Sequence, residues 1–110
     1  MKKIAIPVDG TKISQHFGHC QQFCLVKIDG KELLEKELIP NPGHKPGYLP
    51  RYLRELNIDC ILAAGMGMRA INLFKENDIE VVTGVSGEID YIIDQYLNNC
   101  LETDENACNH

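Results

Sequence analysis

The pattern of apolar positions predicts three strands in the first 40 residues. Lys2–Asp9 is a short run rich in β-branched residues, and Gln22–Asp29 carries apolar residues on both faces. Asp29 and Gly30 together are a hairpin signal, so Lys31–Ile39 is expected to return antiparallel to the second strand.

The rest of the chain alternates between helical and strand patterns. Apolar residues recur at helical spacing over Leu49–Leu56, with Pro50 placed in a first turn. Ser86 is expected to be the N-cap of the last helix. The elements expected after the first helix are a strand, a helix, a strand and a helix, at Asp59–Ala64, Met66–Asn77, Glu80–Thr83 and Ile89–Cys100.

This order of elements predicts an α/β fold with a mixed sheet. The short turn makes the second and third strands antiparallel, whereas strand–helix–strand units need parallel strands and right-handed crossovers. A five-stranded sheet of order 3-2-1-4-5, with the second strand antiparallel and about three helices, satisfies both constraints. The loops after strands 1, 3, 4 and 5 then open at one edge, where ligands of open α/β sheets bind.

The loop after the first strand concentrates candidate metal ligands. His16, His19 and Cys20 lie within seven residues in a chain with only four histidines. Imidazole and thiolate are the ligands that softer transition metals prefer. His44 stands in a loop rich in Pro and Gly after the third strand and would reach the same edge. Two plainer interpretations stay open: a surface loop with chance histidines, and Cys20 as a small apolar residue.

Two glycine-bearing turns precede helices at this edge. One holds Gly65 and Gly67, and the other holds Gly84 and Gly87. Backbone N–H groups and helix N-termini bind anions, and an anion would offset the unfavourable position of Arg69 in a first helical turn. The sequence therefore predicts a pocket with soft-metal donors on one side and anion-binding amides on the other.

Composition and charge bound the class of protein. Its 110 residues suit one domain, and 44% apolar with 25% charged residues is typical of a soluble globular chain. No apolar run approaches the roughly 20 residues of a membrane span, and no signal-peptide core is present. We therefore expect a cytoplasmic protein with no membrane partner and with its five cysteines reduced.

The charge is divided unevenly along the chain. Residues 1–57 carry nine Lys/Arg and six Asp/Glu, whereas residues 58–110 carry two and ten. No basic stripe with interleaved aromatics appears, so nucleic acid is not an expected partner. Residues 1–101 are expected to form one cofactor-binding domain, and the acidic residues 102–110, with Cys108 and His110, a disordered tail.

Several segments carry a resemblance to a known family. Ser14–Gly18, the His44 loop, Gly65–Ala70 and the turn with Gly84 and Gly87 resemble the signature segments of the dinitrogenase iron–molybdenum cofactor biosynthesis family. The similarity spans roughly residues 1–101. In that family, the position of Cys20 is commonly a small residue.

This resemblance implies a ribonuclease-H-like three-layer fold and a nitrogen-fixation accessory or stand-alone protein. It also implies a non-enzymatic carrier that binds an iron–sulfur or molybdenum–iron–sulfur cofactor, or its precursor, and delivers it to a partner protein. The metal ligands would come from His16, His19, His44 and Cys20. The full set of expected cofactor-binding residues is His16, Phe17, Gly18, His19, Cys20, His44, Gly65, Gly67, Arg69, Gly84, Ser86 and Gly87.

Most other functions would need different residue patterns. A small-anion or nucleotide-binding regulatory module would use the same glycine turns. A two-metal nuclease needs clustered carboxylates, yet Ala63 and Ala64 end the fourth strand. The relaxed dinucleotide fingerprint from Gly65 to Ala70 lacks the acidic residue that should follow it. A His19–Cys20 nucleophile lacks an orienting third group, so no enzyme is expected. Cys24, Cys60 and Cys100 are expected in the core.

Overall fold

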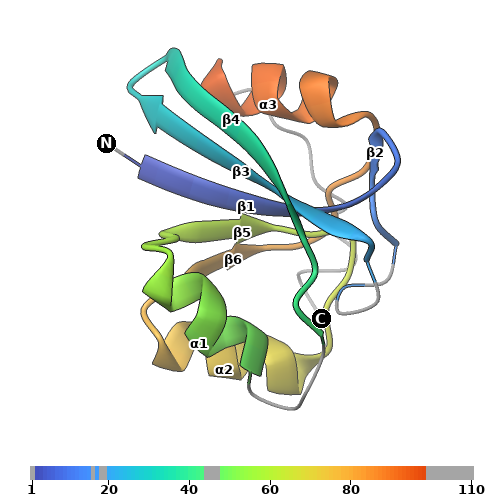
Figure 1. Cartoon of the computed structure of the whole chain (residues 1–110), viewed down its shortest axis with the longest axis vertical. Coiled ribbons are helices and arrows are strands. Elements are labelled where there is room, and N and C mark those ends of the chain that lie inside the picture. The colour runs from blue at the N-terminus through green and yellow to red at the C-terminus, as the bar shows by residue number, and fades with distance from the viewer. Residues whose placement is uncertain (1, 16, 18–19, 44–47, 99–110) are drawn as a thin grey trace.

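The computed structural model describes residues 2–15, 17, 20–43 and 48–98, and its elements alternate between strands and helices after an all-β start (Figure 1). The tail at 102–110 and Cys100 lie outside these residues. The elements are β1 (Lys2–Asp9), β2 (Lys12–Ile13), β3 (Gln22–Asp29), β4 (Glu32–Pro40), α1 (Tyr48–Glu55), β5 (Cys60–Leu62), α2 (Met68–Glu76), β6 (Glu80–Val82) and α3 (Ile89–Leu97).

The strands form one mixed sheet with the path β4-β3-β1-β5-β6. The five strands expected from the sequence correspond, in chain order, to β1, β3, β4, β5 and β6. In that numbering the observed path is 3-2-1-4-5. β3 is antiparallel to both β1 and β4, and β5 is parallel to β1 and to β6. The carboxyl ends of β1, β4, β5 and β6 therefore lie at one edge of the sheet.

In the described part of the chain the sheet has six strands, so the expected count of five was wrong. The extra strand is β2, where Ile13 pairs with Val8 and Lys12 with Asp9. Gly10 makes this tight reversal with φ 69°, a left-handed conformation that glycine adopts without steric cost. A two-residue strand is too short to produce an alternating pattern, which is why periodicity missed it.

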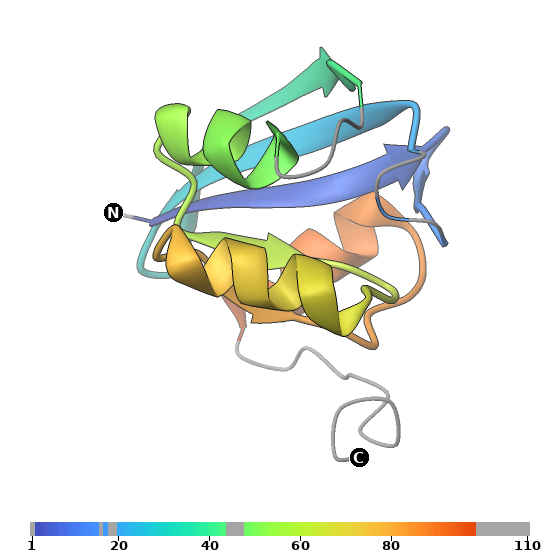
Figure 2. The same cartoon turned by 90° about the horizontal axis from the view of Figure 1, so that it is seen from below.

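Helices cover both faces of the sheet, giving three layers (Figures 1 and 2). Alternation along β1 sends Ile4, Ile6 and Val8 to the face covered by α3, and Ala5 to the face covered by α1 and α2. The first core also buries Cys24 and Cys60, as expected from the sequence. The second core is built on Phe23 and Phe74 together with Leu25, Leu49, Leu53, Ile58, Ile61 and Ile79.

The three expected helices are all present among the described residues. Each turns a short apolar stripe inward: α1 buries Leu49 and Leu53, α2 buries Phe74, and α3 buries Ile89, Ile92 and Ile93. No helix in the described part of the chain is long and apolar enough to cross a membrane.

Candidate functional site

The loops that follow β1, β5 and β6 are joined to one another at the carboxyl edge of the sheet. The Gly84 and Val85 N–H groups donate to the Ala64 and Ala63 carbonyls, at 3.0 and 3.1 Å. The Ile13 N–H, in β2, donates to the Gly87 carbonyl at 3.1 Å. The turn before α3 is thus held between the loop after β5 and the loop after β1.

The N-terminus of α3 is closed by backbone rather than by Ser86. Its N-cap is Glu88, which forms no side-chain capping bond. The Ile89 N–H instead donates to the Thr11 carbonyl at 2.9 Å, beside an isolated bridge between Lys12 and Glu88. The expectation that Ser86 caps this helix was wrong, because a neighbouring loop satisfies the amide that a side chain would otherwise bond.

Phe17 brings the loop after β1 against α2. Its ring lies edge-on to Phe74, with ring centroids 5.4 Å apart, and to Phe23, with centroids 6.1 Å apart. Phe74 is fully buried in α2, and Phe23 is fully buried in β3. The loop therefore packs against the helix that begins after Gly65 and Gly67, so these two sequence-predicted segments lie on the same side of the sheet.

Asp9 connects the two ends of this loop. Ser14 Oγ donates to Asp9 Oδ2 at 2.7 Å, and the Gln21 N–H donates to Asp9 Oδ1 at 2.9 Å. Ser14 is only 2% exposed and its N–H donates to the Pro7 carbonyl at 2.8 Å. The segment from residue 15 to residue 20 thus begins and ends on one carboxylate.

Cys20, near the end of this loop, is bonded to the segment after β4. Its side chain is 3% exposed and belongs to the core that contains Phe23. Asn41 Nδ2 donates to the Cys20 carbonyl at 2.9 Å and lies 3.7 Å from Cys20 Sγ. Burial fits the interpretation of Cys20 as a small apolar residue, and its role as a ligand stays a prediction.

The two glycine turns differ in how many of their amides are engaged. In the second turn, the Gly84 and Val85 N–H groups are bonded, as described above. Among the described residues, no acceptor meets the N–H groups of Gly65, Met66 or Gly67. A Cβ built on Gly65 or Gly67 would have no neighbour within 4 Å, so each position has room for a side chain.

The start of α2 has the polarity expected for an anion site. Gly67 is its N-cap and supplies no side-chain capping bond, and the first turn contains no acidic residue. Arg69 in that turn is exposed. The free N–H groups of a helix N-terminus carry partial positive charge, so this corner of the site favours an anionic group.

Four sequence-predicted residues, His16, Gly18, His19 and His44, lie outside the described residues. Within the described part, no group of three or more His, Cys, Asp or Glu side chains is placed to hold a metal ion. The expected imidazole ligands are therefore untested predictions.

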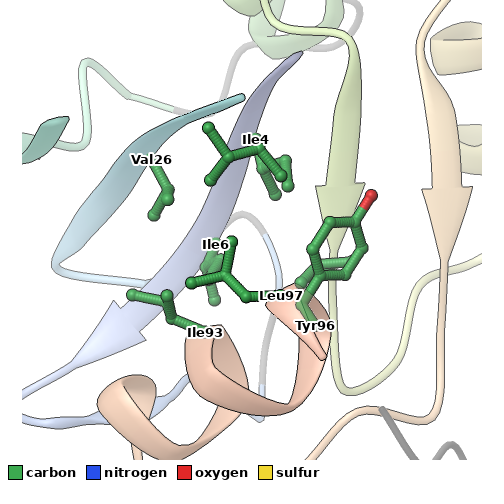
Figure 3. Close-up of a pocket in the computed structure, with 8 residues that line it drawn as sticks. Ile4, Ile6, Val26, Ile93, Tyr96 and Leu97 are labelled. Carbon is green, nitrogen blue, oxygen red and sulfur yellow. The ribbon is translucent and has the colours of Figure 1, made fainter. Parts of the chain in front are cut away.

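The described residues also line hollows away from this edge. An apolar cavity of about 10 Å³, the volume that one water-sized probe occupies, lies between the sheet and α3 (Figure 3). Its lining, apart from the Tyr96 hydroxyl, has no polar side chain, so it offers no set of ligands that could bind a metal ion. A hollow of about 260 Å³ at the opposite sheet edge is lined by Lys2, Lys3, Lys27, Glu35, Asn57 and Asp59. There Lys3 Nζ donates to the Leu56 carbonyl, and the backbone N–H of Lys3 donates to Asp59 Oδ2. These bonds join β1 to the segment between α1 and β5.

The buried thiols of the first core are unsuited to bind metal. Burial, and to a smaller extent the nearby Glu80 carboxylate, together raise the pKa of Cys60 from its ordinary 9.0 to about 12. Burial also raises the pKa of Cys24. Because the thiolate is the form that binds metal, both act as apolar core residues.

Sequence reasoning missed the contributions of Asp9 and Asn41. The sequence marks Asp9 only as the end of a strand, because its partners lie five and twelve residues away. Asn41 had a local signal, since its Oδ1 accepts the Gly43 N–H at 3.0 Å in the Asx turn that asparagine favours. Its bond to Cys20 spans 21 residues and could not be read from the chain.

Comparison with known proteins agrees with this architecture. An uncharacterized protein of Methanocaldococcus jannaschii, MJ0580, is 32% identical over 107 residues, covering 93% of this chain and 91% of that protein. The crystal structure of PH0822 superposes with a TM-score of 0.89 at 31% identity, covering 98% and 99% of the two chains. The apo form of the orange protein from Desulfovibrio gigas has a TM-score of 0.75 at 18% identity, covering 94% and 92%, which is a likeness of fold alone.

The model of the family described as dinitrogenase iron–molybdenum cofactor matches residues 1–99. This match covers every strand and helix described above and the four loops at the carboxyl edge of the sheet. The chain therefore belongs to the dinitrogenase iron–molybdenum cofactor family.

Proposed function

We propose that this protein binds an iron–sulfur or molybdenum–iron–sulfur cofactor, or its precursor, at the carboxyl edge of the sheet. It acts as a carrier without catalysis and delivers its cargo to a protein acceptor. The ribonuclease-H-like description of the fold and the resemblance to nitrogen-fixation accessory proteins stay predictions within the same proposal.

The contact of Phe17 with Phe74 is the observation that carries this proposal. It joins the loop after β1, at Phe17, to the helix that starts after Gly67, with ring centroids 5.4 Å apart. In the sequence, His16 and His19 lie within two residues of Phe17. Family membership supports a metal–sulfur ligand. Soft-metal donors in this loop and backbone amides at the start of the same helix are the two kinds of group that a cargo with soft metal atoms and an anionic sulfide surface requires.

The roles of the residues follow from their chemistry. His16, His19 and His44 would supply imidazole nitrogen to metal atoms of the cargo. The N–H groups at Gly65 and Gly67 would donate hydrogen bonds to its sulfides, and Arg69 would add positive charge. The turn before α3, with Gly84, Ser86 and Gly87, would contribute by holding the loop after β5 in place. The amides of Gly84 and Val85 already bond that loop.

A regulatory module that binds a small anion or a nucleotide is the rival from another class. The same open turn at Gly65 and Gly67 favours it, because free amides and Arg69 recognise phosphate as readily as sulfide. The two proposals differ in their need for histidine: a metal cargo needs the imidazoles, whereas a simple anion does not.

Anaerobic reconstitution tests the proposal. The protein is incubated with ferrous iron and sulfide, with and without molybdate, then desalted and examined by visible absorption and metal analysis. We expect a coloured protein that retains metal, with loading lowered far more by His16→Ala or His44→Ala than by Cys108→Ala. Removing a ligand of a multidentate site breaks a metal bond, whereas Cys108 is a tail residue.

Equal loading of the wild type and of a variant lacking His16, His19 and His44 would contradict the carrier proposal. Calorimetric titration with inorganic phosphate and with ATP then tests the rival. Binding of either anion, without colour and equally well in the variant that lacks the histidines, would support the regulatory module.

A further inference from the structure

Asp9 and Asn41 are the central residues of one continuous hydrogen-bond relay that spans three strand ends. Ser14 Oγ and the Gln21 N–H donate to the two carboxylate oxygens of Asp9, at 2.7 and 2.9 Å. The Asn41 N–H donates to the Gln21 carbonyl at 3.1 Å, and the Gly43 N–H donates to Asn41 Oδ1 at 3.0 Å. The relay therefore runs from Ser14 to Gly43 without a gap.

From this geometry we propose that Asp9 and Asn41 are positioning residues that set the two donor-bearing loops in register with one another. The inference rests on the proposed function, because the loops that it couples carry His16, His19 and His44. Neither residue is assigned a contact with the cargo.

The first half of the relay fixes the span of the loop after β1. Ser14 and Gln21 are seven positions apart, and binding both to one carboxylate fixes the distance between the loop's two ends. Ser14 is 2% exposed, so losing the Asp9 acceptor would remove a hydrogen bond from a buried residue and favour rearrangement of the loop.

The second half transmits this register to the segment after β4. Asn41 bonds the loop end twice, through its N–H to Gln21 and through Nδ2 to the Cys20 carbonyl at 2.9 Å. Its Oδ1 then orders the turn at Gly43, directly before His44. A displacement of Gln21 therefore moves Asn41, and with it the start of the second loop.

Residues that orient ligands without touching the metal have measurable effects. Replacing such a partner costs roughly 10- to 100-fold in metal affinity. We expect Asp9→Ala and Asn41→Ala to raise, within that range, the iron concentration that half-saturates the protein in the presence of sulfide and molybdate. The matched controls are Asp29→Ala, an exposed carboxylate at the end of β3, and Asn72→Ala, an exposed asparagine in α2; both should load like the wild type.

Three further measurements separate positioning from a general loss of structure. Asp9→Asn should recover most of the affinity, because its Oδ1 still accepts the Gln21 N–H and its Nδ2 can donate to Ser14 Oγ. The fold-loss of metal affinity in the double variant should be smaller than the product of the two single fold-losses, because both residues act through one relay. In cargo-free protein, Asp9→Ala should speed amide exchange at Gln21 and at Gly43 while leaving β5 and β6 unchanged.

The outcomes distinguish this inference from the function on which it rests. A wild type that retains no metal would overturn the carrier proposal, while the exchange experiment would still test the relay in the cargo-free protein. If the wild type binds metal and Asp9→Ala loads equally well, the positioning role alone would be overturned. Unchanged exchange at Gly43 would show that the two loops are not coupled. An Asp9→Asn variant as weak as Asp9→Ala, with wild-type exchange at Gly43, would mean that the charge acts on the cargo directly.

Discussion

The ring of Phe17 lies edge-on to the ring of Phe74, with centroids 5.4 Å apart and an angle of 74° between their planes. Edge-to-face contact is the preferred arrangement of an aromatic pair. Phe17 belongs to the loop after β1 and Phe74 to α2, so this contact joins the two segments on which the proposed cargo site depends.

Replacing Phe17 by Ala should loosen the loop without unfolding the protein. We expect a loss of about 2 kcal/mol in the free energy of unfolding, below the 3–5 kcal/mol typical of fully buried phenylalanine, because Phe17 is only half-buried. Urea unfolding followed by circular dichroism measures this loss. Tyr91→Ala, at a side chain 58% exposed, is the control and should change stability by less than about 0.5 kcal/mol. Equal effects of the two substitutions would show that Phe17 anchors nothing.

The two glycine turns should respond differently to alanine. Gly87 has φ 110°, outside the range that an L-residue adopts easily, so Gly87→Ala should destabilise the fold by about 1–2 kcal/mol. Gly65 has open space where a Cβ would stand, so Gly65→Ala should leave the melting temperature nearly unchanged. The added methyl group would nevertheless obstruct the free amides, and metal loading should fall. Normal loading of Gly65→Ala would remove this turn from the site.

Stability should fall in alkaline solution because of Cys60. The unfolded thiol ionises near pH 9.0, whereas burial holds the folded thiol protonated until about pH 12. Between these values the unfolded state releases its proton first, so rising pH favours unfolding and the stability present below pH 9 is progressively lost. Urea unfolding at intervals from pH 8 to about pH 11, with Cys60→Ala for comparison, should give a flatter pH dependence for the variant. Parallel curves would assign the alkaline loss to other groups.

The ion pair between β4 and α3 should contribute little. Lys36 Nζ meets Asp90 Oδ1, and the hydrogen bond raises the pKa of Lys36, but the Asp90 side chain is 85% exposed. A double-mutant cycle with Lys36→Gln and Asp90→Asn should give a coupling below about 1 kcal/mol. In about 1 M salt, where screening acts over roughly 3 Å, the coupling should shrink further. A coupling of several kcal/mol that ignores salt would indicate that this pair holds α3 to the sheet.

Much of the architecture was predictable because local sequence patterns determine it. The apolar runs of β1 and β3, the turn at Gly30 and the helical spacing after Leu49 each depend on residues close in the chain. The antiparallel hairpin and the parallel units then restrict the strand path, and with it the edge at which the loops meet. Burial of Cys24 and Cys60 followed from their place in apolar strands.

The tertiary structure decided the features whose partners are distant in sequence. β2 exists because Gly10 reverses the chain onto β1, and Thr11, not Ser86, satisfies the first amide of α3. The Gly84 and Val85 amides bond the loop after β5, whereas the Gly65 and Gly67 amides meet no acceptor among the described residues. A hydrogen bond between groups twenty or more residues apart leaves no periodic trace in the sequence. The sequence therefore determined which loops converge, and only the folded chain determined which of their polar groups are already paired.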